Sequence, residues 1–119
     1  MKDLTILPDH LRDIAFVSGG ECGWPLDKAS EVIRALVDAG AVVSGVEAWS
    51  VDAEGVPASV GWSFYELEDC ADDWQALAAA SRVEAERVLA SVMETAAEHE
   101  VNYVGIEWDT CGDAEAAEA

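Results

Sequence analysis

Carboxylates are the chemical group that this chain holds in excess, and they could bind metals, transfer protons or attract cations. Asp and Glu number 25, whereas Lys and Arg number 6, so the formal net charge is −19. Four acids, Glu66, Glu68, Asp69 and Asp73, could bind a divalent cation, but their spacing differs from that of a calcium-binding loop. Carboxylate pairs are common in so acidic a chain, so pairing alone does not indicate catalysis.

Other catalytic signatures are missing from the sequence. His10 and His99 belong to no His-Glu-x-x-His motif, and the three cysteines are too far apart to form a metal-ligand pattern. Ser18-Gly19-Gly20 is not followed by the Gly-Lys-Ser/Thr of a phosphate loop, and no Gly-x-Ser-x-Gly motif occurs. We therefore expect no enzyme, no bound metal and no cofactor.

The distribution of charge indicates the kind of partner. No Lys or Arg lies between Arg34 and Arg82, and none follows Arg87, while acids are frequent in both stretches. The negative electrostatic potential that results repels nucleic acid and anionic membranes and attracts basic proteins. The same charge could instead serve solubility or adaptation to salt, so charge alone does not select a partner.

Length and composition predict a single globular domain. The chain has 119 residues, of which 51% are hydrophobic, so we expect one folded domain over residues 1–109. Residues 110–119 are an Ala/Glu/Asp segment that we expect to be a disordered acidic tail. No run is apolar enough to span a membrane and no signal peptide is visible, which favours a cytoplasmic protein, although a processed secreted form would look the same.

A β-hairpin is the centre of the predicted fold. Residues 41–51 and 58–65 are rich in β-formers, and Asp52-Ala53-Glu54-Gly55 between them has the composition of a turn. Its free edge could pair with a second copy, so the sequence leaves the oligomeric state open.

Helices and a further strand flank this hairpin. Apolar residues recur at helical spacing between Pro25 and Gly40 and again over residues 74–98, and residues 101–108 alternate as a strand. Residues 18–24 have the composition of a loop. We therefore predict an α+β domain in which two main helices cover one face of a small antiparallel or mixed sheet.

Alternation within the strands predicts a polar face opposite the helices. It places Glu47, Trp49 and Tyr65 on the wetter face of the hairpin with Glu107 nearby, and Trp62 on the covered face. Both faces of the first strand are largely apolar, so its assignment is ambiguous. Aromatic rings beside carboxylates are typical of protein-binding surfaces.

Several short motifs, taken in order, resemble a known family. The motifs are Trp24, Gly40, Gly45-Val46-Glu47-Ala48-Trp49, the segment 57–62 and Asp73-Trp74. Over about residues 23–108 the chain resembles immunity protein 40, a family of bacterial polymorphic-toxin immunity proteins. It departs from that pattern where Val46 replaces a glycine, Glu47 an aspartate, Trp49 a tyrosine and Gly61 an asparagine.

This resemblance implies a cytoplasmic inhibitor that binds a cognate toxin, frequently a nuclease, and protects the producing cell. A basic toxin would suit the charge of this chain. Two alternatives stay open: an acidic nucleic-acid mimic that blocks a DNA-binding enzyme, and a small enzyme or ligand-binding module whose charge serves solubility. The residues that we predict to contact the partner are Glu47, Trp49, Tyr65, Glu66, Glu68, Asp69 and Glu107.

Overall fold

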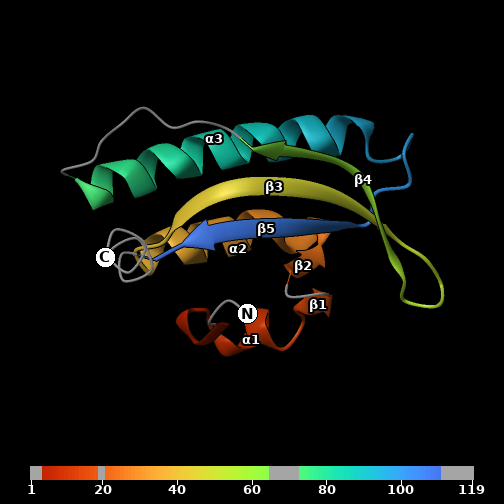
Figure 1. Ribbon diagram of the computed structural model, residues 1–119, viewed down its shortest axis with the longest axis horizontal. Helices are drawn as coiled ribbons and strands as arrows, with labels where there is room; N and C mark the ends of the chain where they lie inside the picture. The colour runs from red at the N-terminus through yellow and green to blue at the C-terminus, as the bar shows by residue number, and fades with distance from the viewer. Residues whose placement is uncertain (1–3, 19–20, 65–72, 111–119) are drawn as a thin grey trace.

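The protein is an α+β domain in which helices cover one face of a curled antiparallel sheet (Figure 1). The computed structural model describes residues 4–18, 21–64 and 73–110. Its elements are η1 (Leu4–Ile6), α1 (Asp9–Arg12), β1 (Phe16–Ser18), β2 (Glu21–Pro25), η2 (Leu26–Lys28), α2 (Ala29–Asp38), β3 (Val42–Val51), β4 (Pro57–Phe64), α3 (Trp74–Thr95) and β5 (Tyr103–Asp109).

The sheet has five strands in the order β1-β2-β5-β3-β4, and every neighbouring pair is antiparallel. The predicted hairpin is confirmed as β3 and β4, and the predicted third strand is β5, which pairs along the other side of β3. β3 is therefore the central strand of this half of the sheet. None of the described helices is both long and apolar enough to cross a membrane.

The predicted loop at residues 18–24 is wrong, because Glu21–Pro25 forms β2. This strand pairs with β5 through Gly23 and Gly105, and β1 pairs with its other side. β1 ends at Ser18 and β2 begins at Glu21, so most of the segment predicted as a loop is strand. The sheet consequently has two more strands than the sequence predicted.

The hydrophobic core lies between the sheet and the two main helices. Trp24 on β2 and Trp108 on β5 are fully buried, and their ring centroids lie 6.2 Å apart. The indole Nε1 of Trp24 donates a hydrogen bond of 2.8 Å to the carbonyl of Leu11, which fixes the N-terminal segment to the core. Buried residues of α2 and α3 that pack in the same core are Ala29, Val32, Ile33, Leu36, Ala85, Val88 and Leu89.

A β-bulge at Ser44 decides which side chains of β3 face this core. Val43 pairs with Trp108, but the next pair is Gly45 with Glu107, so Ser44 is an extra residue in β3. Val43 and Val46 consequently both lie in the core, although alternation had placed Val43 with Glu47 on the opposite face. The bulge breaks the period of two on which that prediction depended.

The pairing of β4 also differs from the predicted grouping. Glu47 lies directly opposite Trp62 in the register, whereas alternation had placed Glu47 on the wetter face and Trp62 on the covered face. Val60 is the extra residue of a second bulge, because Trp49 pairs with Ser59 and Ala48 pairs with Gly61. The same bulge leaves Val60 39% exposed rather than covered by the helices.

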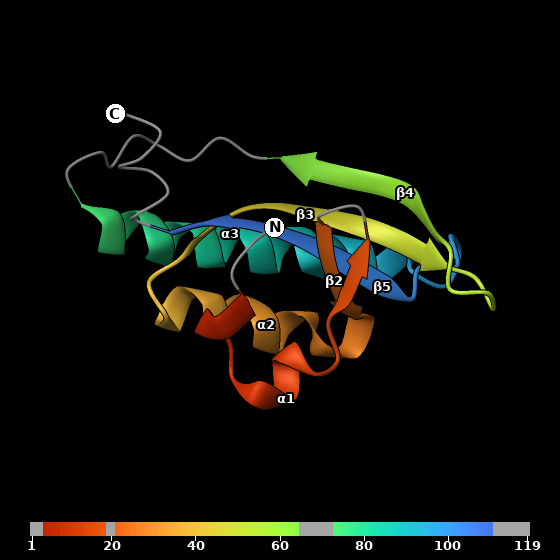
Figure 2. The same ribbon diagram turned by 60° about the horizontal axis from the view of Figure 1, so that its bottom comes forward.

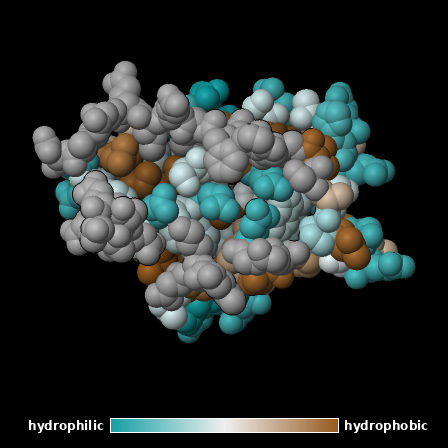
Figure 3. Space-filling view, in the orientation of Figure 1, coloured by the Kyte–Doolittle hydropathy of each residue, from teal (hydrophilic) through white to brown (hydrophobic). Residues whose placement is uncertain are grey.

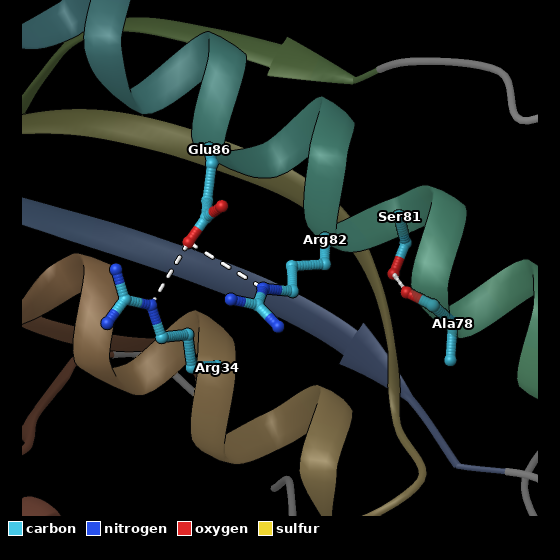
Figure 4. A network of polar contacts seen from close by, with 5 residues as sticks. All are labelled: Arg34, Ala78, Ser81, Arg82 and Glu86. Atoms are coloured by element: carbon cyan, nitrogen blue, oxygen red, sulfur yellow. Dashed lines mark hydrogen bonds and ion pairs between the residues drawn. The ribbon is translucent and has the colours of Figure 1, made fainter.

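Ser81 of α3 provides a polar contact at the bulge in β3 (Figure 4). Its hydroxyl accepts a hydrogen bond of 3.0 Å from the backbone N–H of Val43 and donates one of 2.7 Å to the carbonyl of Ala78. The side chain is fully buried, so water cannot replace either bond. Ser81 thus links the helix to the strand at the residue before the bulge.

Ser81→Ala is expected to destabilise the protein by about 1–3 kcal/mol, because the buried Val43 N–H loses this acceptor. Equilibrium denaturant unfolding measures the change. Ser91→Ala is the matched control, since Ser91 is exposed on the same helix, and its effect should stay within about 0.5 kcal/mol. Equal effects of the two substitutions would show that the Ser81 contact does not stabilise the bulge.

Candidate functional site on the carboxylate face

The face of the sheet opposite α2 and α3 carries charged and aromatic side chains, and we call it the carboxylate face. The register places Glu47 opposite Gly105, Gly45 opposite Glu107, and Trp49 opposite Tyr103, and directly paired residues share a face. Gly23 pairs with both Gly105 and Phe16, which extends the same face to β2 and β1. Its charged and aromatic residues include Phe16, Glu21, Glu47, Trp49, Tyr103 and Glu107.

Trp49 is held on this face by two glycines. A Cβ atom on Gly105 would lie 2.6 Å from Cζ2 of the Trp49 indole, and one on Gly23 would lie 2.4 Å from its Cζ3. No real side chain tolerates such distances, so the indole can lie across β2 and β5 only because both positions are glycine. The ring crosses from β3 over two neighbouring strands and covers their backbones.

Further rings surround Trp49. Phe16 approaches Trp49 edge-on, with centroids 6.3 Å apart and an interplanar angle of 75°, and it lies 5.6 Å from the ring of Tyr103. Trp49 is only 3% exposed, whereas Phe16 and Tyr103 are half-buried. Trp49 therefore supports the carboxylate face from below, and Phe16 and Tyr103 are the rings that a partner could contact.

Three carboxylates from three neighbouring strands accompany these rings. Glu21 belongs to β2, Glu107 to β5 and Glu47 to β3, which is also their spatial order. Burial raises the pKa of Glu21 above its ordinary value of 4.5, and the negative charges of Glu47 and Glu107 raise it further. Burial and the charge of Glu107 likewise raise the pKa of the Cys22 thiol. These carboxylates therefore repel one another across the sheet.

Positive charge is separated from this face. Strands β1–β5 contain Glu21, Glu47, Glu107 and Asp109 but no Lys, Arg or His. Figure 3, which views the sheet from the side away from α2 and α3, shows hydrophilic residues near the middle of this face.

The arginines of the described chain lie on helices and face carboxylates there. Arg34 of α2 and Arg82 of α3 both approach Oε1 of Glu86, at 3.4 Å and 3.8 Å from their Nε atoms (Figure 4). Arg87 lies 2.8 Å from Glu84, and Arg12 forms an ion pair with Asp9. These pairs use the basic side chains locally, so they do not neutralise the carboxylate face.

Catalytic chemistry has little geometric support in the described residues. His10 lies 2.5 Å from Glu31, and this contact joins α1 to α2 on the exposed surface. His99 is exposed in the turn after α3. In residues 4–18, 21–64 and 73–110, no three His, Cys, Asp or Glu side chains are placed to hold a metal ion. The chemistry that the carboxylate face offers is electrostatic attraction of cations.

The structure brings together part of the predicted site. Glu47 and Glu107 lie on the carboxylate face as the sequence predicted, whereas Tyr65, Glu66, Glu68 and Asp69 fall outside the described residues. Trp49 lies on the same face but is buried, so it is not the exposed partner contact that the sequence predicted. Sequence reasoning missed Glu21 and Phe16, because Glu21 was assigned to a loop and no strand was predicted at Phe16. The alternation of Glu21 and Gly23 with buried Cys22 and Trp24 is the signal that could have revealed them.

In comparisons with known proteins, no family model, no curated protein and no solved structure matches this chain.

Gly105→Ala is expected to destabilise the protein by about 1–3 kcal/mol, because the new Cβ must displace the Trp49 ring. In a Trp49→Ala background the same substitution should cost much less, since the clashing ring is gone. Denaturant unfolding of the two single variants and the double variant gives the coupling free energy. Additive effects would show that Trp49 does not lie over Gly105.

Glu47→Gln is expected to lower the pKa of Glu21, because it removes one of the charges that raise this pKa. NMR titration of side-chain carboxyl carbons measures the shift, and Glu31→Gln on α2 is the control that should leave Glu21 unchanged. The direction of the Glu21 pKa shift also determines how the stability of the protein depends on pH. A raised pKa favours the protonated folded state, so this contribution is complete below pH 4.5 and is lost as pH rises through the folded-state pKa of Glu21.

Glu21→Gln should therefore stabilise the protein above that folded-state pKa and have little effect below pH 4.5. A stabilisation that is largest in acid would contradict the assigned direction of the shift.

Proposed function

We propose that this protein is an immunity protein that binds and neutralises a basic bacterial toxin domain, such as a nuclease, in the cytoplasm of the producing cell. The observation that carries the proposal is the separation of charge. The strands present carboxylates without any basic residue, while the arginines are engaged with acids on the helices. A basic protein surface is the complement of such a face.

The arrangement of the face also fits protein binding. Glu47 and Glu107 share the carboxylate face with half-buried Tyr103 and Phe16, so one face of the sheet offers both charged and aromatic groups. Trp49 beneath them fixes the backbone and limits the entropy lost on binding. The motif resemblance to immunity protein 40 supports the toxin as the class of partner. Further contacts are Tyr65 and three acids of the sequence segment 66–73, which we call the connector: Glu66, Glu68 and Asp69.

The acidic nucleic-acid mimic is the alternative that the same charge allows. A mimic would bind the nucleic-acid site of a DNA-binding enzyme, and added nucleic acid would compete with it. An immunity protein would instead protect cells from one toxin, the product of a neighbouring gene. Growth of cells that express the neighbouring toxin gene, measured with and without co-expression of this protein, separates the two functions.

Charge reversal at the face tests the binding surface directly. Glu47→Lys with Glu107→Lys is expected to slow association with the toxin by at least about tenfold at low salt, because steering by the face is lost. Stopped-flow kinetics at several salt concentrations measures the change. The control, Glu31→Lys with Glu94→Lys, alters the net charge equally at exposed helical positions and should change the rate by less than about threefold.

Equal slowing by both double variants would show that net charge rather than the carboxylate face attracts the partner. The same assay with Glu66, Glu68 and Asp69 reversed tests the connector, whose reversal should also slow association and weaken its salt dependence. An unchanged rate would remove those three residues from the site.

A further inference from the structure

The outer edge of β4 is free for pairing within the part of the chain that the structure describes. β4 is the last strand of the sheet and pairs with β3 alone. Figure 2 shows it at the margin of the sheet, apart from α3. In an antiparallel strand every second residue directs its N–H and C=O away from its one partner, so β4 presents such groups outward.

Only part of this edge carries the features that usually prevent pairing. Pro57 begins the strand, and the bulge at Val60 interrupts it. The remaining segment, Gly61-Trp62-Ser63-Phe64, has neither proline nor charge, although 26% of the whole chain is charged. Edge strands that must stay single commonly carry charged side chains, most often Lys. The segment 61–64 is therefore a strand edge without the charge or proline that usually prevents pairing with another strand.

We propose that residues 61–64 accept an extended segment of the partner, which adds a sixth strand to the sheet and carries Lys or Arg at alternate positions. The inference rests on the proposed function, because the occupant is a segment of the basic toxin. Charge selects this occupant. Glu47 lies opposite Trp62 on the neighbouring strand, and Asp52 and Glu54 lie in the turn before β4.

The geometry lets cationic side chains of the added strand reach these acids. Neighbouring strands lie about 4.8 Å apart, so the added backbone is about 9.6 Å from β3. A Lys or Arg side chain extends roughly 6–7 Å from its Cα and can approach Glu47 across β4. Alternate residues of the added strand share one face, which is why the cations must alternate.

The same charges disfavour a second copy of the chain as the occupant. Two β4 strands paired to each other would bring together two chains that each have a formal net charge of −19. Each chain would also bring its own Glu47, Asp52 and Glu54 to the shared edge, with no basic strand residue to neutralise them. A basic segment gains attraction where a second copy meets repulsion.

The test uses the full chain and two capped peptides, Lys-Thr-Lys-Val-Lys-Thr-Lys and its counterpart with Glu at each Lys position. Backbone NMR with amide hydrogen exchange should show protection of alternate amides within residues 61–64 on adding the Lys peptide. The Glu peptide should give none. Glu47→Gln should weaken binding of the Lys peptide several-fold, and Glu31→Gln should not.

Proline substitution separates pairing from folding. Trp62→Pro and Ser63→Pro each remove one N–H, and only one of these two neighbouring groups points outward. One variant should lose the Lys peptide while it keeps its melting temperature, and the other should lower the melting temperature by weakening the β3–β4 pair. Retention of peptide binding by whichever variant keeps its melting temperature would overturn the proposal.

Three further results would overturn it: no binding at roughly 1 mM Lys peptide, protection mapped outside β4, or a dimer joined through β4. The outcome is also distinct from that of the proposed function. Protection from a neighbouring toxin, with the β4 amides unprotected in the complex, would refute only the added strand. Peptide pairing at β4 without protection from any toxin would refute only the immunity function.

Discussion

The bulge at Ser44 is the local constraint that sets the rest of the sheet. Regular alternation along β3 would place Val43 on the same side as Glu47, and the core would lose a fully buried valine. With one extra residue, Val43 packs beside Trp108 while Glu47 and Trp49 remain on the other side. Ser81 accepts a hydrogen bond from the Val43 N–H, so α3 stabilises the strand at the point where it departs from regular geometry.

The two sides of the sheet follow from that constraint. On one side α2 and α3 bury an aliphatic and indole core, and on the other Trp49 lies flat over Gly23 and Gly105. Because these glycines have no side chains, there is room for the indole, which covers the backbone of β2 and β5. The carboxylates of the strands therefore lie on rigid elements that Trp49 supports, rather than on mobile loops.

Local sequence signals predicted the β3–β4 hairpin, both main helices, β5 and the α+β class. The turn at Asp52–Gly55 and the apolar period of α2 are encoded within a few residues. β2 was missed because its pairing depends on Gly105, about 80 residues away in sequence. Both bulges were invisible for the same reason, since they arise from the fit of β3 to β5 and β4. Glu47 and Glu107 could be grouped from alternation alone, because no bulge interrupts β3 between Gly45 and Glu47 or β5 between Gly105 and Glu107.

The strand carboxylates are costly to the folded chain, and this cost argues for a role outside it. Burial and the negative charges of Glu47 and Glu107 raise the pKa of Glu21, so ionised Glu21 opposes folding at neutral pH. Solubility does not require this arrangement, because the remaining acids still far outnumber the bases. The arginines could have relieved the repulsion but are paired with acids on the helices. A cationic partner placed over the face would remove the repulsion on binding, so the same charges that weaken the free protein would stabilise its complex.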